Sequence, residues 1–92
     1  MSILVRFSPE SLTGDQYDEV QRRLEQGGQW PPDGLEYHVC FGSDGGLKVS
    51  EIWASNGQFE AFGERLRPIL DDVGITLAKP PEFLDVYNQE RP

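Results

Sequence analysis

A histidine, an acid and an indole stand close together in residues 35–55, at spacings that fit two paired strands. Between them, Asp44-Gly45 predicts a tight hairpin turn, because both residues tolerate the positive φ that such a turn requires. Strand side chains alternate between two faces, so pairing outward from the turn decides which residues oppose each other. The predicted cross-strand pairs are Phe41 with Lys48, Cys40 with Val49, His38 with Glu51, and Glu36 with Trp53.

The pairing of His38 with Glu51 suggests acid–base chemistry. Imidazole titrates near neutral pH, and a facing carboxylate selects the tautomer that the ring adopts. Such a pair would serve as a general base toward a ligand in a cavity. It would serve equally well as a structural cross-strand pair that satisfies two buried groups and sets the register. Both interpretations stay open, and His38 and Glu51 are the predicted catalytic candidates.

The predicted register divides the hairpin into two faces. One carries Glu36, His38, Cys40, Val49, Glu51 and Trp53, and the other carries Tyr37, Val39, Phe41, Ile52 and Ala54. We predict that the second face packs on helices, together with Ile3, Val5 and Phe7 of a first strand. The first face is then too apolar to be left in water, and we predict that a second copy of the sheet covers it.

Arg6 and Trp53 complete the predicted ligand site. Alternation along the first strand puts Arg6 on the same face, where it would hold a ligand carboxylate or phenolate, or pair with an acid of the sheet. Trp53 would stack on an aromatic ligand or simply fill the interior. Cys40 would be a reactive thiol only if it were exposed with a lowered pKa, and is otherwise a small buried residue. The predicted ligand-binding residues are therefore Arg6, His38, Glu51 and Trp53.

Composition excludes several classes of partner. The chain has 16 acidic and 8 basic side chains and a net charge of −8, so we expect neither nucleic acid nor an anionic membrane as a partner. Its single cysteine forms no disulfide within the chain, which fits a reducing compartment and predicts a cytoplasmic protein. With one histidine and one cysteine, we predict no metal site and no cofactor.

The rest of the chain supplies the elements that position these residues. Residues 3–7 alternate as a first strand, and Thr13-Gly14-Asp15-Gln16 is a capping box that starts a helix. Ser55 repeats that spacing before a second apolar helical stripe, in which Pro68 is expected to kink the helix or divide it. The chain closes with a fourth strand over residues 83–87 and a frayed tail over residues 88–92.

This order, βαββαβ, predicts a ferredoxin-like α+β domain over residues 1–92. Right-handed crossovers place both helices on one face of a four-stranded antiparallel sheet. At this length a single core is small, and a partner subunit would add buried area.

The stretch from Glu51 to Phe62 resembles the segment between third strand and second helix in the antibiotic-biosynthesis-monooxygenase-like group of dimeric α/β barrels. Glu51, Trp53, Ser55 and Glu60-Ala61 fit its pattern of an acid, a spacer, an aromatic residue, a serine cap and a helix. The resemblance implies a homodimer whose two sheets face each other and enclose a cavity. Where many active relatives place a histidine on the second helix, this chain has Phe62.

Three hypotheses of function follow. The first is a homodimeric barrel that binds a small aromatic or anionic molecule. The second is a cofactor-independent monooxygenase or related small enzyme acting on a phenolic substrate, with His38 as base, Glu51 orienting it, Arg6 stabilising an oxyanion and Trp53 positioning the ring. The third is a structural or interaction dimer whose barrel is filled by side chains.

Overall fold

The computed structural model describes residues 1–92. Its elements are β1 (Ile3–Phe7), α1 (Gly14–Gln26), β2 (Leu35–Phe41), β3 (Lys48–Trp53), α2 (Asn56–Val73) and β4 (Glu82–Asp85). The predicted βαββαβ order is confirmed. The last strand starts one residue earlier and ends two residues earlier than the predicted range of 83–87.

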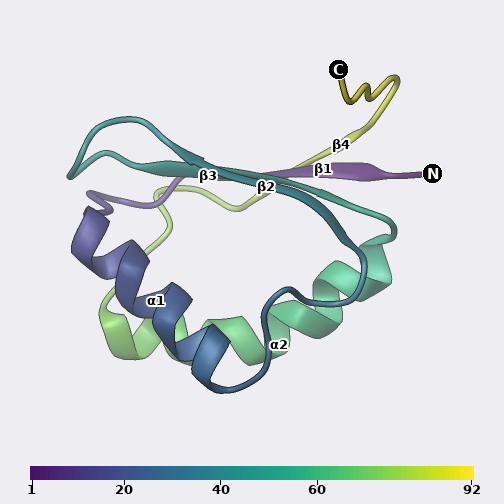
Figure 1. The fold of residues 1–92 in the computed structure, drawn as a ribbon. Coiled ribbons are helices and arrows are strands. Elements are labelled where there is room, and N and C mark those ends of the chain that lie inside the picture. Colours follow the sequence, from purple (N-terminus) through teal and green to yellow (C-terminus); the bar gives the residue numbers. More distant parts are fainter.

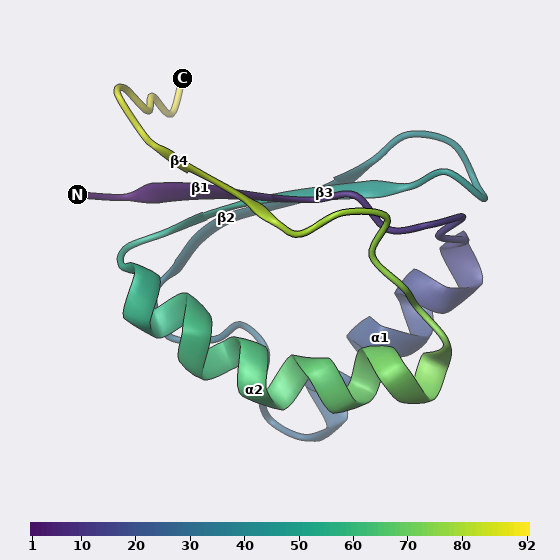
Figure 2. The same ribbon diagram turned by 180° about the vertical axis from the view of Figure 1, so that it is seen from behind.

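The four strands form one antiparallel sheet in the order β2-β3-β1-β4. Both helices lie against the same face of this sheet, as Figures 1 and 2 show from opposite sides. The ferredoxin-like α+β fold is therefore confirmed. The face that the helices cover is called the inner face below, and the opposite one the outer face. No helix meets the length and hydropathy requirements for crossing a membrane.

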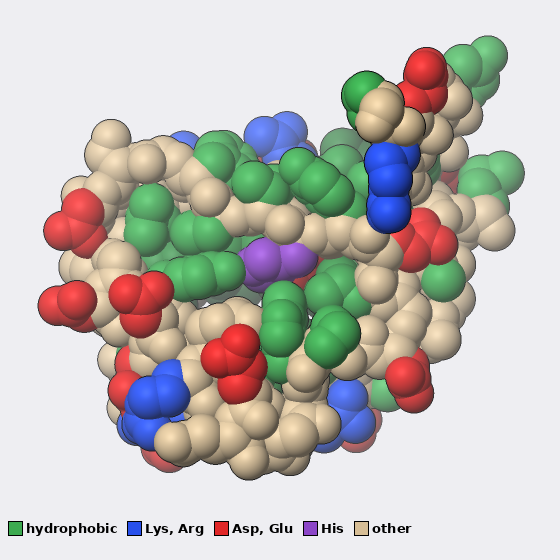
Figure 3. Space-filling view, viewed as in Figure 1, with side chains coloured by type: hydrophobic (Ala, Val, Ile, Leu, Met, Phe, Trp, Pro, Cys, Tyr) green, Lys and Arg blue, Asp and Glu red, His purple; other side chains and the backbone are tan.

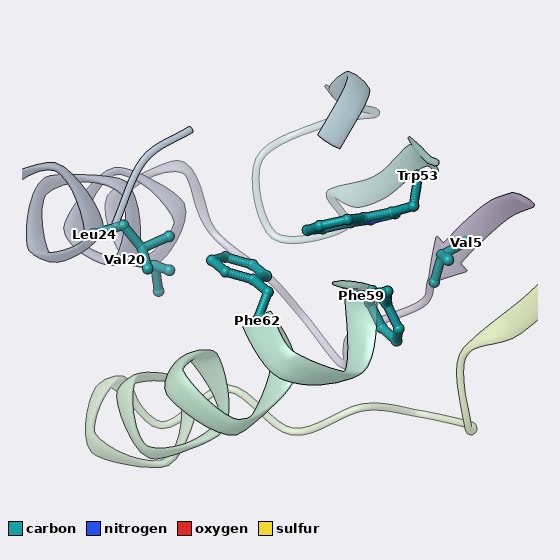
Figure 4. Packing of buried hydrophobic residues seen from close by; sticks show 6 residues of the cluster. All are labelled: Val5, Val20, Leu24, Trp53, Phe59 and Phe62. Atoms are coloured by element: carbon teal, nitrogen blue, oxygen red, sulfur yellow. The ribbon is translucent and has the colours of Figure 1, made fainter. Parts of the chain in front are cut away.

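The core fills the space between the inner face and the two helices. Trp53, Phe62 and Val5 are its largest fully buried side chains. The Trp53 ring contacts Phe59 and Phe62 of α2, with ring centroids 5.6 and 5.5 Å apart (Figure 4). Val20 and Leu24 approach the same cluster from α1. Aromatic packing between β3 and α2 thus holds the sheet on its helices.

Capping explains where the helices begin and end. The predicted capping box is present at Thr13, whose hydroxyl accepts a hydrogen bond from the Gln16 amide while Gln16 reaches back to the Thr13 amide. Ser55 caps α2, which ends at Gly74 with a left-handed φ of 84°. The helix continues through Pro68 as one element. Of the two outcomes expected at Pro68, a kink or a division of the helix, the division does not occur.

The β2–β3 hairpin has most of the predicted register. His38 opposes Glu51, Cys40 opposes Val49, and Phe41 opposes Lys48. The predicted pairing of Glu36 with Trp53 is wrong, because a register shift between residues 35 and 37 puts Leu35 opposite Trp53. The turn also differs from prediction. Gly46 donates to the Ser43 carbonyl as expected for a turn centred on Asp44-Gly45, but of these two central residues only Gly45 has a positive φ.

The assignment of the hairpin faces to core and surface was wrong. Val5 pairs directly with Glu51, and Ile3 with Trp53, so the side chains of these four residues share one face. Because Val5 and Trp53 are completely buried under the helices, His38, Glu51 and Trp53 belong to the inner face. The outer face instead carries Leu4, Arg6, Tyr37, Val39, Phe41, Lys48, Ser50, Ile52, Glu82 and Leu84.

Candidate functional site

Three polar side chains form a continuous hydrogen-bonded chain between α1 and the sheet. The Tyr17 Oη lies 2.6 Å from Nε2 of His38, and Nδ1 of the same ring lies 2.7 Å from Oε2 of Glu51. The members come from α1, β2 and β3 in turn. This set is called the Tyr–His–Glu relay below. It has the connectivity of a hydroxyl, a base and an orienting carboxylate.

Glu51 is the fixed end of the relay. Glu51 is 4% exposed and is the one charged residue that is buried in the core. Its second oxygen, Oε1, accepts a hydrogen bond of 3.0 Å from the indole Nε1 of Trp53. Since an ionised carboxylate only accepts hydrogen bonds, the His38 Nδ1 is the donor to Oε2. Nε2 of His38 is then left as an acceptor for the phenolic O–H of Tyr17.

The pKa of Tyr17 supports this distribution of protons. Burial raises this pKa above the ordinary value of 10.0, and the neighbouring Cys40, Glu51 and Asp18 raise it further. A phenol with a raised pKa keeps its proton at neutral pH, so Tyr17 has a proton that it can donate to His38. In this arrangement a proton can pass from Tyr17, or from a ligand bound beside it, to Nε2 of His38.

The hairpin loop fixes the position of Tyr17 relative to His38. Asp44 Oδ1 accepts a hydrogen bond of 2.7 Å from the amide of Gly14, the first residue of α1. The amide of Leu47 donates to the carbonyl of Leu12 just before that helix. These contacts hold the start of α1 against the loop that joins β2 and β3. Tyr17 lies one turn further along α1, above the strand that carries His38.

A cavity of about 80 Å³ opens beside the relay, between the inner face and both helices. Twelve of its 16 lining residues, Tyr17 included, are hydrophobic, and its polar groups are the Tyr17 hydroxyl and the side chains of Gln21, His38 and Glu51. The Trp30 ring meets the His38 ring edge-on, with centroids 5.0 Å apart. The chain's single histidine, purple in Figure 3, lies at the surface between apolar side chains, and its side chain is 18% exposed. This space is called the inner cavity below.

The sequence-predicted residues separate into two groups. His38, Glu51 and Trp53 come together as expected, but inside one subunit and under the helices. Arg6 does not join them, because it pairs with Ser50 on the outer face and is exposed. The expectation that Arg6 shares a face with His38 is wrong, and so is the expectation that this face is the outer one. Trp53 is fully buried, where it holds Glu51.

Two site residues, Tyr17 and Trp30, were missed from the sequence. Tyr17 belongs to the apolar stripe of α1 with Val20 and Leu24, so spacing alone gave it a place in the core. Trp30 lies in the loop after α1, where no periodicity applies. A signal was available only for Tyr17: its hydroxyl, once buried, requires a partner. Cys40 is half-buried, and burial together with Asp18 raises the pKa of its thiol, as expected of a structural cysteine.

Comparisons with known proteins were made on sequence and on structure. No family model matches the chain, and no curated protein matches its sequence. Among solved structures, SnoaB, a cofactor-independent oxygenase from Streptomyces nogalater, is 12% identical with a TM-score of 0.62, over 96% of this chain and 93% of SnoaB. A Caulobacter crescentus protein, named provisionally as an antibiotic biosynthesis monooxygenase, is 21% identical with a TM-score of 0.63, over 95% of this chain and 91% of its own.

The chain has the fold of the antibiotic biosynthesis monooxygenases. A further structure with this fold, the Nitrosomonas europaea protein NE2512, is described as of unknown function; it is 14% identical with a TM-score of 0.62, over 99% of this chain and 92% of its own. At these identities the likeness concerns the backbone. The chemistry of the site must therefore be argued from the relay and the inner cavity. The structure contains no cluster of three or more His, Cys, Asp or Glu side chains that could hold a metal ion.

Proposed function

We propose that the chain binds a small, largely apolar molecule with one hydroxyl or acidic C–H group in the inner cavity, and that the relay accepts a proton from it. The observation that carries this proposal is the relay itself, whose phenolic end borders an apolar cavity. The mostly hydrophobic lining favours a ring, and the polar groups of Tyr17, Gln21, His38 and Glu51 orient a single polar atom. The anionic ligand expected from Arg6 loses its support, since Arg6 is on the outer face.

The proton moves in two linked steps. The ligand gives its proton to the Tyr17 Oη as the phenolic proton passes to Nε2 of His38, which lies 2.6 Å away. The imidazolium that forms is stabilised by the buried carboxylate of Glu51 at 2.7 Å. Trp53 keeps that carboxylate in place. General base catalysis of this kind contributes about 10²–10⁴-fold to a rate.

A second candidate function is cofactor-independent oxygenation, which is the activity that the name of SnoaB gives for that protein. In this chain the relay would remove a proton from a ring-activated CH₂ group. The carbanion then transfers one electron to dioxygen, and the two radicals combine in a peroxide C–O bond. The peroxide anion takes back the proton that the relay removed. Removal of the second C–H proton by the relay then breaks the O–O bond and leaves a ketone, and the hydroxide released combines with that proton to give water. The sum is R₂CH₂ + O₂ giving R₂CO + H₂O.

We also propose that two copies associate through their outer faces. Tyr37 and Leu84 are each 50% exposed there, and Phe41 is 38% exposed. The charged residues of this face are Arg6, Lys48 and Glu82, so the strong negative charge of the chain does not oppose self-association at this surface. Such a dimer leaves the inner cavity within each subunit, in contrast to the predicted cavity between the two sheets.

Phenol is the smallest probe of the proposed function. When phenol is titrated into the protein and monitored by NMR, the ring signals of the single histidine should shift. Toluene, which lacks the hydroxyl, should bind more weakly than phenol. His38→Gln and Tyr17→Phe should each weaken phenol binding, whereas Tyr87→Phe, at a fully exposed tyrosine, should not. Phenol binding that leaves the histidine signals in place, or that survives both substitutions, would exclude the relay as the recognition element.

The oxygenase candidate has its own test. Oxygen consumption is followed with an anthrone as the ring-activated CH₂ compound in air-saturated buffer. With wild-type protein, oxygen consumption should be faster than in the same anthrone solution without protein. His38→Gln should lower the protein-dependent rate by about 10²-fold or more. If wild-type protein did not raise the rate of oxygen consumption above that without protein, this candidate would be rejected and the binding proposal would stand.

A further inference from the structure

A second, wider cavity of about 600 Å³ lies at the other side of the layer between helices and sheet. It is a groove bounded by α2, by the segment from Ile75 to Pro81, and by Phe83 of β4. It is called the outer groove below. Seven of its 14 lining residues are apolar, and Phe83 meets Phe59 edge-on across it, with centroids 5.5 Å apart.

The inner cavity and the outer groove share a wall of five apolar side chains, which come from β1, α2 and the segment after it. The shared residues are Phe7, Leu66, Leu70, Ile75 and Leu77. All five are only partly buried. The two spaces are therefore neighbours, because the same partly buried aliphatic and aromatic side chains line both of them.

The sheet order places the two spaces in line. The inner cavity lies under β2, β3 and β1, where His38, Glu51 and Phe7 line it. The outer groove lies under β1 and β4, where Phe7 and Phe83 line it. Since the strands follow each other as β2-β3-β1-β4, the two spaces adjoin along the inner face and together form one path under the sheet. The relay is at the β2 end of this path, and the wide opening is at the β4 end.

We propose that the outer groove is the second half of the ligand site, and that the ligand enters there with its acidic group leading. The inference rests on the proposed function of the relay. It assigns a ligand of two parts: a single ring with a hydroxyl or acidic C–H that fills the inner cavity, and a second ring or apolar extension that lies in the groove along α2. The 80 Å³ inner cavity alone is small for a ligand of several rings.

The charges of the outer groove select the kind of extension. Three carboxylates line it, from Glu60, Glu64 and Asp71, against one guanidinium, from Arg67. None of these four makes an ion pair within 4.0 Å. An anionic extension would face this excess of negative charge, so the extension is uncharged or cationic.

Gly63 offers a way to fill the groove without disturbing the relay. It lines the outer groove but not the inner cavity, and a Cβ built on it meets no atom within 4 Å. Gly63→Phe should therefore be tolerated and should occupy the groove. Gly57 is the matched control, since it also lies in α2 with open space at its Cβ but lines neither cavity. Gly63→Leu serves as a second, smaller filler.

The probes are phenol and 4-phenylphenol, which differ by one ring. In wild type 4-phenylphenol should bind more tightly. Gly63→Phe should weaken binding of 4-phenylphenol by about tenfold or more and leave phenol unchanged, while Gly57→Phe should change neither. Adding a carboxylate at the far end of 4-phenylphenol should weaken binding to wild type in a salt-dependent manner.

The outcomes distinguish this inference from the proposed function. If phenol binds wild type but Gly63→Phe and Gly63→Leu leave the affinity for 4-phenylphenol unchanged, the outer groove is not part of the site, while the relay proposal stands. The same conclusion follows if 4-phenylphenol binds wild type no more tightly than phenol does. If neither probe shifts the histidine signals, the proposed function itself fails.

Discussion

The indole Nε1 of Trp53 donates a hydrogen bond of 3.0 Å to the Glu51 carboxylate, two residues earlier on the same strand. The two side chains share the inner face because strand residues at this spacing point the same way. Trp53 is fully buried and Glu51 nearly so. A large apolar ring thus brings a carboxylate into the core and supplies one of the two donors that make its burial tolerable.

Replacing Glu51 by glutamine should reverse the direction of the relay. A glutamine amide has one accepting end, its oxygen, and one donating end, its nitrogen. Because the Trp53 N–H can only donate and therefore requires the oxygen, the amide nitrogen is left to face His38 Nδ1. The ring should then carry its proton on Nε2, where it cannot accept from Tyr17. Histidine ¹⁵N shifts measure the tautomer, and the single histidine makes the assignment unambiguous. An unchanged Nδ1–H tautomer in Glu51→Gln would contradict the proposed proton arrangement.

Substitutions at Trp53 should separate packing from hydrogen bonding. Trp53→Ala removes a fully buried ring and should lower the free energy of unfolding by about 3–5 kcal/mol. Trp53→Phe keeps most of the packing but leaves Glu51 short of a donor, at a cost of about 1–3 kcal/mol. Urea denaturation measures both. If the phenylalanine variant were as stable as wild type, the indole N–H would contribute nothing to holding Glu51.

Tyr17 should make stability depend on alkaline pH. Its pKa in the folded chain is raised above 10.0, chiefly by burial. Between the ordinary value and the raised one, the folded chain keeps a proton that the unfolded chain has lost. The free energy of unfolding therefore falls as pH rises through that window. Denaturant titrations at several pH values should show a steeper fall for wild type than for Tyr17→Phe. The slope for Tyr87→Phe should match wild type, because that side chain is fully exposed.

Local patterns predicted much of this fold because they depend on a few neighbouring residues. The Thr13 capping box, the Ser55 cap and the turn at Asp44-Gly45 each involve residues within four positions of one another. The turn then set the pairing of His38 with Glu51, because register propagates along a hairpin. The bulge at residues 35–37 interrupts that propagation, and the prediction failed from there outward.

The choice of the buried face could not be predicted from the hairpin alone. Both faces are partly apolar, so their composition does not decide which one the helices cover. The decision comes from β1, whose Val5 opposes Glu51 rather than Ile52, a long-range register that no turn sets. The buried face then carries a glutamate and a histidine, which composition would assign to the surface. Their cost of burial is offset by hydrogen bonds from Trp53 and Tyr17 that the sequence pattern does not reveal.

The proposed outer-face dimer predicts a change in oligomeric state on mutation. Tyr37 is half-exposed on β2 and lies on this face. Tyr37→Glu would place a carboxylate from each subunit in the contact and should shift the protein toward monomer in sedimentation equilibrium. Tyr87→Glu, outside the sheet, adds the same charge as a control. A wild-type protein that sediments as a monomer at all concentrations, or a Tyr37→Glu dimer of unchanged strength, would contradict the proposal.

Asp44 should couple the hairpin loop to the relay. Its carboxylate accepts from the Gly14 amide at 2.7 Å, one of the amides that the start of α1 leaves without a helical partner. Asp44→Ala should lower the free energy of unfolding by about 0.5–2 kcal/mol, the range for a lost helix cap. Because α1 carries Tyr17, the same variant should also weaken phenol binding and broaden the histidine ring signals.

Asp44→Asn is the matched variant, because its side-chain oxygen still accepts the Gly14 hydrogen bond while the charge is lost. It should retain most of the stability and the phenol affinity of wild type. If the alanine variant lost stability but kept full affinity, the loop would support α1 without positioning Tyr17. If both variants lost affinity equally, the charge of Asp44 rather than its hydrogen bond would be the property that matters at the site.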